Sequence, residues 1–338
     1  MNKKFSWNLL SRYRGELYGL SIASIMIFHY FEDTSIYGAP HTLIQKLSYP
    51  YMHYISSLGV DIFLILSGLS LYYSMKKDPH IFHFYQKRLS RVIIPYLMIG
   101  TPFWIIRYFL RGSGTPMQFL KDLSTISFWE SGNRQVWYIS FIIMLYLIYP
   151  LVFQYLQKIS FPVSCCAVML TAFSILCCKT AFPSFYSNCE IALWRIIPFE
   201  IGVYLGVKSY NKETIPIIAV PVLALAGLFL RRAFLFHGFI FIDGRFMSTL
   251  YAFSLLLLGA CICALFSNRL FHRILIWLGN NSLELYLTHV LIRGLCLTAS
   301  IPTNNPAVYC LVLSTSLFIS PWIHTAASQI SARIVARA

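Results

Sequence analysis

Long runs of apolar residues alternate with short polar segments along almost the whole chain. Each run is about as long as the roughly 20 apolar residues that an α-helix needs to cross a hydrocarbon core about 30 Å thick. The pattern therefore predicts an all-α fold, a polytopic bundle of about ten transmembrane helices. The predicted segments are 16–34, 54–75, 91–110, 136–156, 161–179, 190–207, 214–231, 246–266, 274–299 and 306–327.

The two longest polar stretches, 32–53 and 111–135, contain Gly, Pro, Ser and Thr, and we predict that both are loops. No repeat period is evident along the sequence. We therefore predict a single integral membrane domain over 1–338, with no separate soluble domain.

Composition also favours a membrane protein, because 57% of the residues are hydrophobic and 12% are charged. Soluble domains have about 25% charged residues, and a soluble protein with this composition would lack the polar surface to cover its apolar residues. The net charge of +15 would suggest nucleic acid in a soluble protein. Here the cations lie in short segments between apolar runs and form no stripe with aromatic residues, so we expect no nucleic-acid partner.

The distribution of Lys and Arg predicts the orientation, because cytoplasmic segments retain positive charge. With the N-terminus inside, the outer loop between the first two helices contains one such residue, Lys46. The first apolar run ends at 29–31 without a small-residue cleavage site, so we expect a retained helix and two cytoplasmic termini. The first two inner segments contain nine cations: Lys3, Lys4, Arg12, Arg14, Lys76, Lys77, Lys87, Arg88 and Arg91.

The nine cysteines lie mostly inside apolar runs. Thiols in this setting usually pack as small apolar residues. No Cys/His spacing typical of a metal site is present, so we expect neither a disulfide framework nor a bound metal.

Ionisable residues inside apolar segments are functional candidates, because a membrane makes them costly. A histidine can accept a hydroxyl proton at neutral pH, a carboxylate can orient the imidazole, and an arginine can hold an anionic group. Each also has a structural interpretation, in which it is satisfied by a neighbour, anchors helix packing or reaches the membrane interface. Four such residues are predicted to share the outer half of the bundle: His29, Asp61, Arg195 and His289.

A second constellation lies at 84–96, where Lys87, Arg88 and Arg91 are predicted to precede the third helix on the cytoplasmic side. These cations can serve as a positive-inside anchor for the helix. Alternatively, they can bind the phosphates of a cytosolic donor, since arginine makes bidentate contacts with phosphate.

Five ordered motifs, spread over nearly the whole chain, resemble those of the membrane acyltransferase 3 family. Members of this family acylate surface polysaccharides, lipopolysaccharides, peptidoglycan and small molecules. The motifs are GVDIFLILSGL at 59–69, KRLSRVIIPY at 87–96, WYIS at 137–140 with Tyr146 and Pro150, RIIPFEIGVYLG at 195–206 and LGNNSLELYLTH at 278–289.

The resemblance implies an acyltransferase in which His29 is the catalytic base, aided by Asp61 or His289. Lys87, Arg88 and Arg91 would face an acyl-CoA donor, expected to be acetyl-CoA, and no tightly bound cofactor is expected. The expected acceptor is a hydroxyl of a surface or lipid-linked carbohydrate, presented from the outer side of a bacterial plasma membrane.

One departure from the family pattern concerns the first helix. The family commonly has an arginine eleven positions before the histidine, where this chain has Tyr18. Arg14 lies one turn earlier and can reach the same space, because residues i and i+4 share a helix face. The chain therefore resembles a variant subgroup, with Arg14 as a further donor-binding candidate.

The remaining site candidates are Trp137, Tyr138, Arg195 and Glu284, which we assign to substrate binding. The two aromatic residues can stack on a sugar, or can simply be interfacial residues. Ser67 beside Gly68 favours close helix packing over a role as nucleophile. A glycan transporter or a non-catalytic partner in an export complex remains the alternative, although no matching pair of Gly/Pro-interrupted segments is seen.

Overall fold

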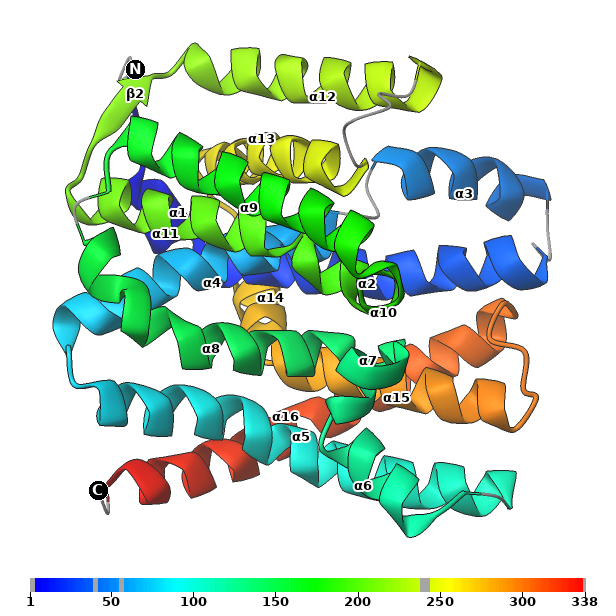
Figure 1. The fold of residues 1–338 in the computed structure, drawn as a ribbon. Coiled ribbons are helices and arrows are strands. Elements are labelled where there is room, and N and C mark those ends of the chain that lie inside the picture. Colours follow the sequence, from blue (N-terminus) through cyan, green and yellow to red (C-terminus); the bar gives the residue numbers. More distant parts are fainter. Residues whose placement is uncertain are drawn as a thin grey trace.

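The computed structural model describes residues 4–38, 42–54, 58–112, 114–157, 159–237 and 244–336. Most of the long helices lie side by side and run between two ends of one bundle, as Figure 1 shows. The predicted polytopic all-α membrane fold is therefore confirmed. The helices are α1 (Asn8–Arg12), α2 (Arg14–Tyr37), α3 (Thr42–Tyr54), α4 (Leu58–Lys77), α5 (Ile81–Arg111), α6 (Pro116–Leu123), α7 (Ile126–Ser131), η1 (Arg134–Val136), α8 (Trp137–Leu156), α9 (Phe161–Ala181), α10 (Pro183–Leu193), α11 (Ile196–Tyr210), α12 (Ala219–His237), α13 (Gly244–Leu265), α14 (Arg269–Asn280), α15 (Ser282–Thr298) and α16 (Pro306–Ala336).

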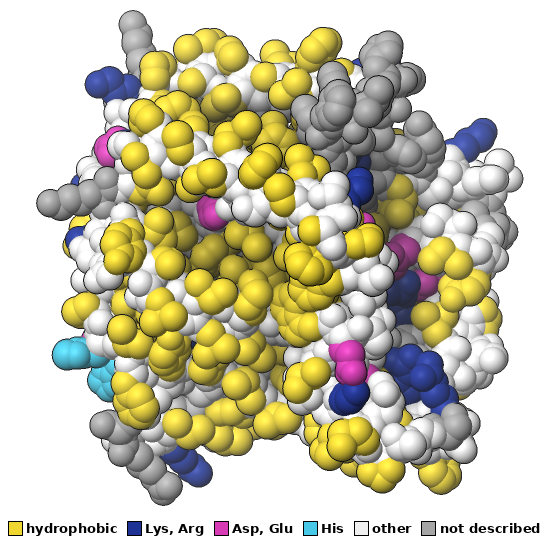
Figure 2. Space-filling model, viewed as in Figure 1, with side chains coloured by type: hydrophobic (Ala, Val, Ile, Leu, Met, Phe, Trp, Pro, Cys, Tyr) yellow, Lys and Arg dark blue, Asp and Glu magenta, His cyan; other side chains and the backbone are white. Residues whose placement is uncertain are grey.

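The surface of the bundle is suited to lipid. Figure 2 shows hydrophobic side chains spread over the middle of one face, with charged side chains mainly toward the two ends. The helix α9 contributes large exposed apolar residues such as Phe161, Met169 and Phe173. Within the described residues, five helical segments are long and apolar enough to cross a membrane by length and composition.

Two predicted segments are each broken into two helices. The segment 190–207 contains the end of α10 and most of α11, and the segment 274–299 contains the end of α14 and all of α15. At the second break, the side-chain amide of Asn281 donates a hydrogen bond to the carbonyl of Trp277 at 2.8 Å. Asparagine competes in this way for helical backbone groups, which explains why a continuous apolar pattern contains a break.

The prediction of loops at 32–53 and 111–135 is wrong over part of each stretch. The first contains the end of α2 and most of α3, and the second contains α6, α7 and η1. The hydroxyl of Thr115 accepts a hydrogen bond from the backbone N–H of Gln118 at 3.2 Å, and Pro116 opens α6. An N-cap threonine followed by proline is a helix start, which a count of turn-forming residues alone overlooks.

The chain also contains a small sheet that the hydrophobic pattern did not predict. The strands β1 (Lys4–Ser6) and β2 (Thr214–Pro216) pair antiparallel, with Phe5 opposite Ile215. Strands of three residues are too short to show the alternation on which strand prediction rests.

Glycine permits a close helix contact between α4 and α11. A Cβ atom added to Gly68 would lie 2.3 Å from the carbonyl oxygen of Phe199, and one added to Gly202 would lie 2.1 Å from that of Ile65. Only glycine allows backbones to approach this closely. The glycine next to Ser67 is therefore required for packing.

The strand β1 and the C-terminal end of α16 lie at the same end of the bundle, on the left in Figure 1. This placement agrees with the prediction that both termini lie on one side of the membrane. Following the predicted orientation, we call this the cytoplasmic end and the opposite one the outer end. Of the nine cations that predicted it, Lys3 lies outside the described residues.

Candidate active site

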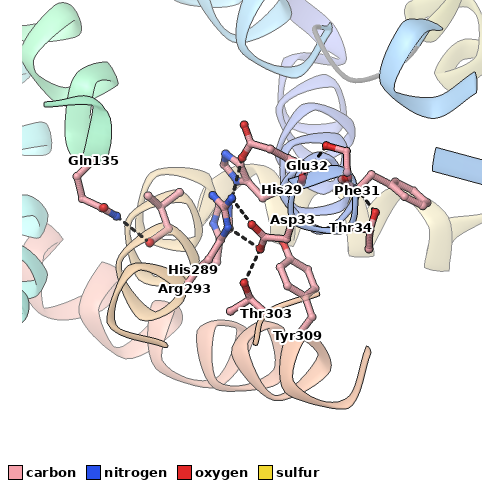
Figure 3. A network of polar contacts seen from close by, with 12 residues as sticks. His29, Phe31, Glu32, Asp33, Thr34, Gln135, His289, Arg293, Thr303 and Tyr309 are labelled. Carbon is pink, nitrogen blue, oxygen red and sulfur yellow. Dashed lines mark hydrogen bonds and ion pairs between the residues drawn. The ribbon is translucent and has the colours of Figure 1, made fainter. Parts of the chain in front are cut away.

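The two histidines predicted to lie in the outer half form a pair between α2 and α15 (Figure 3). The distance from His29 Nδ1 to His289 Nε2 is 2.8 Å, and His289 Nδ1 lies 2.6 Å from the carbonyl oxygen of Leu285. A carbonyl oxygen can only accept, so His289 carries its proton on Nδ1 and its Nε2 accepts from His29 Nδ1–H. The chain of bonds leaves Nε2 of His29 with a free lone pair, which is the form of a general base.

A network of charged residues lies one helical turn farther toward the outer end (Figure 3). Arg293 binds Asp33 through two hydrogen bonds of 2.8 and 2.5 Å and Glu32 through a third of 2.8 Å. Thr303 donates to the same Asp33 carboxylate at 2.7 Å. Asp33 is fully buried, so the pair links α2 and α15 beside the histidines.

The sequence analysis did not identify this network, although the spacing of its residues along the chain indicates it. Asp33 follows His29 by four residues, and Arg293 follows His289 by four. Residues four apart share a helix face. Two facing helices that bring their histidines together must therefore also bring the carboxylate to the arginine.

Asp61 lies in a different group of contacts from the histidine pair. Its carboxylate is 3.4 Å from Nε of Arg195 and accepts a hydrogen bond of 3.4 Å from Thr249. Asp61 is buried on α4, where it faces α11 and α13. Asp61 pairs with Arg195 and Thr249, and His29 pairs with His289. The structure therefore does not bring the predicted carboxylate to the predicted base.

Aromatic residues link the two groups. The guanidinium of Arg195 lies 5.0 Å from the ring of Trp137, which contacts Tyr138 at 5.9 Å between centroids. Tyr138 contacts Tyr286 at 5.4 Å, and Tyr286 contacts His289 at 6.1 Å. Trp137 and Tyr138 thus lie between the Asp61–Arg195 pair and the histidines.

A large cavity of about 700 Å³ lies between α2, α5, α15 and α16, and we call it the donor cavity. All four residues predicted to bind the donor line it, together with residues near the cytoplasmic end of α16 such as Val335. Lys87 and Arg91 are exposed and Arg88 is partly buried. The prediction that these cations precede the third helix is wrong. The helix α5 begins at Ile81, so they lie on its first turns. The four predicted donor residues are Arg14, Lys87, Arg88 and Arg91.

The cations of the donor cavity lack carboxylate partners within the described part of the chain. Arg14 donates to the hydroxyl of Ser70 at 3.3 Å, and Arg88 donates to the carbonyl of Ser70 at 3.4 Å. Nε of Arg88 is buried and has no hydrogen-bond partner among the described residues. A buried N–H without a partner is costly, so the cavity is suited to an anionic ligand that supplies acceptors.

Glu284 lines the same cavity, on the cytoplasmic side of the histidine pair. Its carboxylate lies 3.1 Å from Nδ1 of His324 on α16. The predicted substrate residue therefore faces the donor side rather than the outer side. His324 also lines the cavity, and the sequence analysis did not identify it as a candidate.

A small cavity of about 50 Å³ separates the donor cavity from the histidines. Ser282 and Leu283 line both cavities. Tyr286 lines the small cavity and contacts His289. The two cavities are therefore neighbours, and Tyr286 lies between the small cavity and His289.

The acyltransferase 3 family model, described as an acyltransferase domain, matches residues 18–325. The chain belongs to the acyltransferase 3 family. It is therefore a membrane acyltransferase. No curated protein and no solved structure matches the chain.

The family match begins at Tyr18. Tyr18 lines the donor cavity, and its ring lies 5.0 Å from that of Phe63, which lines the small cavity. Arg14 lines the donor cavity as well. In this acyltransferase Tyr18 thus lies between the two cavities, and Arg14 lies one turn toward the cytoplasmic end.

Within the described residues, no group of three or more His, Cys, Asp or Glu side chains is placed to hold a metal ion.

Proposed function

We propose that the chain transfers an acetyl group from acetyl-CoA, bound at the cytoplasmic end, to a hydroxyl of a carbohydrate reached from the outer end. The observation that carries the proposal is the donor cavity. Four cations line it, none with a carboxylate partner in the part of the chain that the structure describes, and it adjoins the small cavity beside the histidine pair. A transporter or a non-catalytic partner does not require a base with a free lone pair at the end of such a cavity.

The donor is acyl-CoA because its chemistry matches the cavity. Its phosphates are anionic and bind arginine through bidentate hydrogen bonds. Lys87 and Arg91 lie on the exposed side of the cavity, and Arg88 is partly buried. The phosphates would therefore bind near the cytoplasmic end, and the pantetheine arm would carry the thioester inward.

The reaction follows from the hydrogen bonds of the histidine pair. Nε2 of His29 accepts the proton of the acceptor hydroxyl, and the oxygen attacks the thioester carbonyl carbon. A C–O bond forms and the C–S bond breaks. The CoA thiolate then takes the proton that His29 accepted, which gives free CoA and returns His29 to its neutral form. His289 holds the His29 ring through Nδ1, so the base is oriented before the acceptor arrives.

The carbohydrate acceptor rests on the family resemblance and on the place of the base. His29 lies on α2 one turn before Glu32 and Asp33, toward the outer end. An acceptor built outside the cytoplasm would approach from that end. Membership of the family together with the apolar helices supports a multi-pass protein of the bacterial plasma membrane.

The test uses the purified full chain in lipid, given radiolabelled acetyl-CoA and an isolated surface glycan. Label should appear on the glycan with the natural chain and fall about 10²- to 10⁴-fold with His29→Gln, the usual contribution of a general base. His83→Gln is the matched control, because His83 is exposed and pairs with Asp78 at the start of α5.

Undiminished transfer by His29→Gln would reject His29 as the base. Absence of transfer from acetyl-CoA to every envelope glycan tried, with the natural chain folded, would favour a transporter or a non-catalytic partner.

A further inference from the structure

We propose that the small cavity is the site of the acyl group and that its walls restrict the donor to acetyl-CoA. The inference rests on the proposed function and adds the residues that select the acyl chain. The cavity lies between α2, α4, α8 and α15, and Phe63, Val60, Ile25 and Tyr138 form part of its wall.

The cavity lies on the path that the acyl group must take. Ser282 and Leu283 border both this cavity and the donor cavity. Ile25 lines it one helical turn before His29, and Tyr286 lines it while its ring contacts His289. A thioester arriving from the donor cavity therefore places its acyl group here before it reaches the base.

The volume of the cavity matches a very short acyl group. A cavity of about 150 Å³ holds benzene, which has six carbon atoms. About 50 Å³ is one third of that volume, enough for two or three heavy atoms, and an acetyl group has three. A butyryl group adds two methylene groups and exceeds the space.

The walls are held in place by close packing. The ring of Phe63 lies 5.0 Å from that of Tyr18 and 6.5 Å from that of Tyr138. At Gly59, α4 approaches α2 so closely that an added Cβ would lie 2.9 Å from the carbonyl oxygen of Ser21. Because packed interiors compress little, a longer chain must displace side chains rather than expand the cavity.

The wall chemistry selects against charged acyl groups as well. The lining residues are apolar apart from a serine and two tyrosines, and none of them carries a formal charge. A succinyl or malonyl group would bury a carboxylate without a cationic partner, which is strongly unfavourable. The expected acyl class is therefore neutral and two carbons long.

The test measures kcat/KM for acetyl-, butyryl- and succinyl-CoA with the natural chain and with Phe63→Ala. One methylene in an apolar pocket changes selectivity by about 10- to 200-fold, so the natural chain should prefer acetyl over butyryl by at least about 100-fold. Phe63→Ala should reduce that ratio to about 10-fold or less, by raising the rate with butyryl-CoA. Binding of CoA itself, measured as inhibition, should be unchanged.

The control is Phe103→Ala, because Phe103 is buried in the same core but does not line the cavity. It should lower stability while leaving the acetyl-to-butyryl ratio as in the natural chain. Ile25→Ala is a second enlarging variant in case Phe63→Ala fails to fold.

Three outcomes overturn the inference. The natural chain using butyryl-CoA as well as acetyl-CoA, or both enlarged variants keeping the natural ratio, would reject the cavity as selector while leaving the acyltransferase assignment intact. Absence of transfer from every acyl-CoA would instead reject the proposed function, and the inference with it.

Discussion

Arg293 and Arg88 are both arginines inside a membrane bundle, but their surroundings differ in a way that separates structure from ligand binding. Arg293 is bonded to two carboxylates at the outer end of the histidine pair. Arg88 lines an open cavity of about 700 Å³, and its Nε has no hydrogen-bond partner. Arg293 has carboxylate partners in the chain, whereas no carboxylate among the described residues pairs with Arg88.

This difference shows that the cost of an ionisable group in a membrane does not identify its role. Both arginines are expensive to place there. A cation whose bonds are satisfied by its own protein positions other groups, as Arg293 does for α2 and α15. A cation beside a cavity without an anionic partner indicates a ligand that arrives from outside the chain.

The largest predicted effect that tests this comparison is a lower free energy of unfolding in the Arg293→Ala variant. The change leaves Asp33 fully buried and without its cation, which costs about 3–5 kcal/mol. Arg91→Ala, at an exposed position on the cavity, should cost about 0.5 kcal/mol or less. Reversible unfolding in detergent measures both variants.

The double variant Arg293→Ala with Asp33→Ala is the control for that prediction. It should recover part of the lost stability, because the unpaired carboxylate is gone. An Arg293→Ala chain as stable as the natural one would show that the outer ion pair has no structural role.

The second effect concerns orientation of the base. His289→Ala removes the acceptor of His29 Nδ1–H, and kcat should fall about 100-fold, within the range of general-base contributions. His289→Gln offers an amide oxygen as a replacement acceptor and should lose about 10-fold. Equal losses in the two variants would contradict the assignment of His289 as the group that holds His29.

The third effect is on donor affinity. A hydrogen bond to a charged group contributes about 1.5–3 kcal/mol, so Arg88→Ala should raise KM for acetyl-CoA at least about 10-fold. Lys87→Ala and Arg91→Ala should act in the same direction but less, because both residues are exposed. Lys46→Ala, on exposed α3, is the matched loss of charge and should leave KM as it is.

The smallest effect is expected at the wall between the cavities. Tyr18→Phe keeps the ring that packs on Phe63 at 5.0 Å and removes only the hydroxyl. Steady-state rates should stay within about twofold of the natural chain. A loss of 100-fold would mean that the tyrosine hydroxyl itself takes part in binding or chemistry.

Much of the fold, and which cations line one cavity, could be predicted from the sequence. The apolar runs predicted the bundle because lipid forces each crossing segment to satisfy its own backbone, which leaves few alternatives to a helix. The cluster of Lys87, Arg88 and Arg91 lies on two adjacent turns, so one helix brings it to one cavity. Arg14 lines the same cavity, because it shares a helix face with Tyr18.

The rotation of each helix could not be predicted. Glu284 and His289 are five residues apart, which turns them about 140° from each other around the helix axis. One faces His324 across the donor cavity and the other faces His29. Asp61 similarly faces Arg195 instead of His29, because neighbouring helices, rather than the apolar pattern, decide which side of α4 faces which partner.

The central claim is that donor and acceptor reach one base from opposite faces of the membrane. The most direct measurement supplies labelled acetyl-CoA to sealed vesicles of defined orientation, with the glycan acceptor on the other side. Label should reach the glycan only when acetyl-CoA is on the face that carries the termini, and Arg88→Ala should weaken that transfer. Equal transfer with acetyl-CoA on the opposite face would contradict the account.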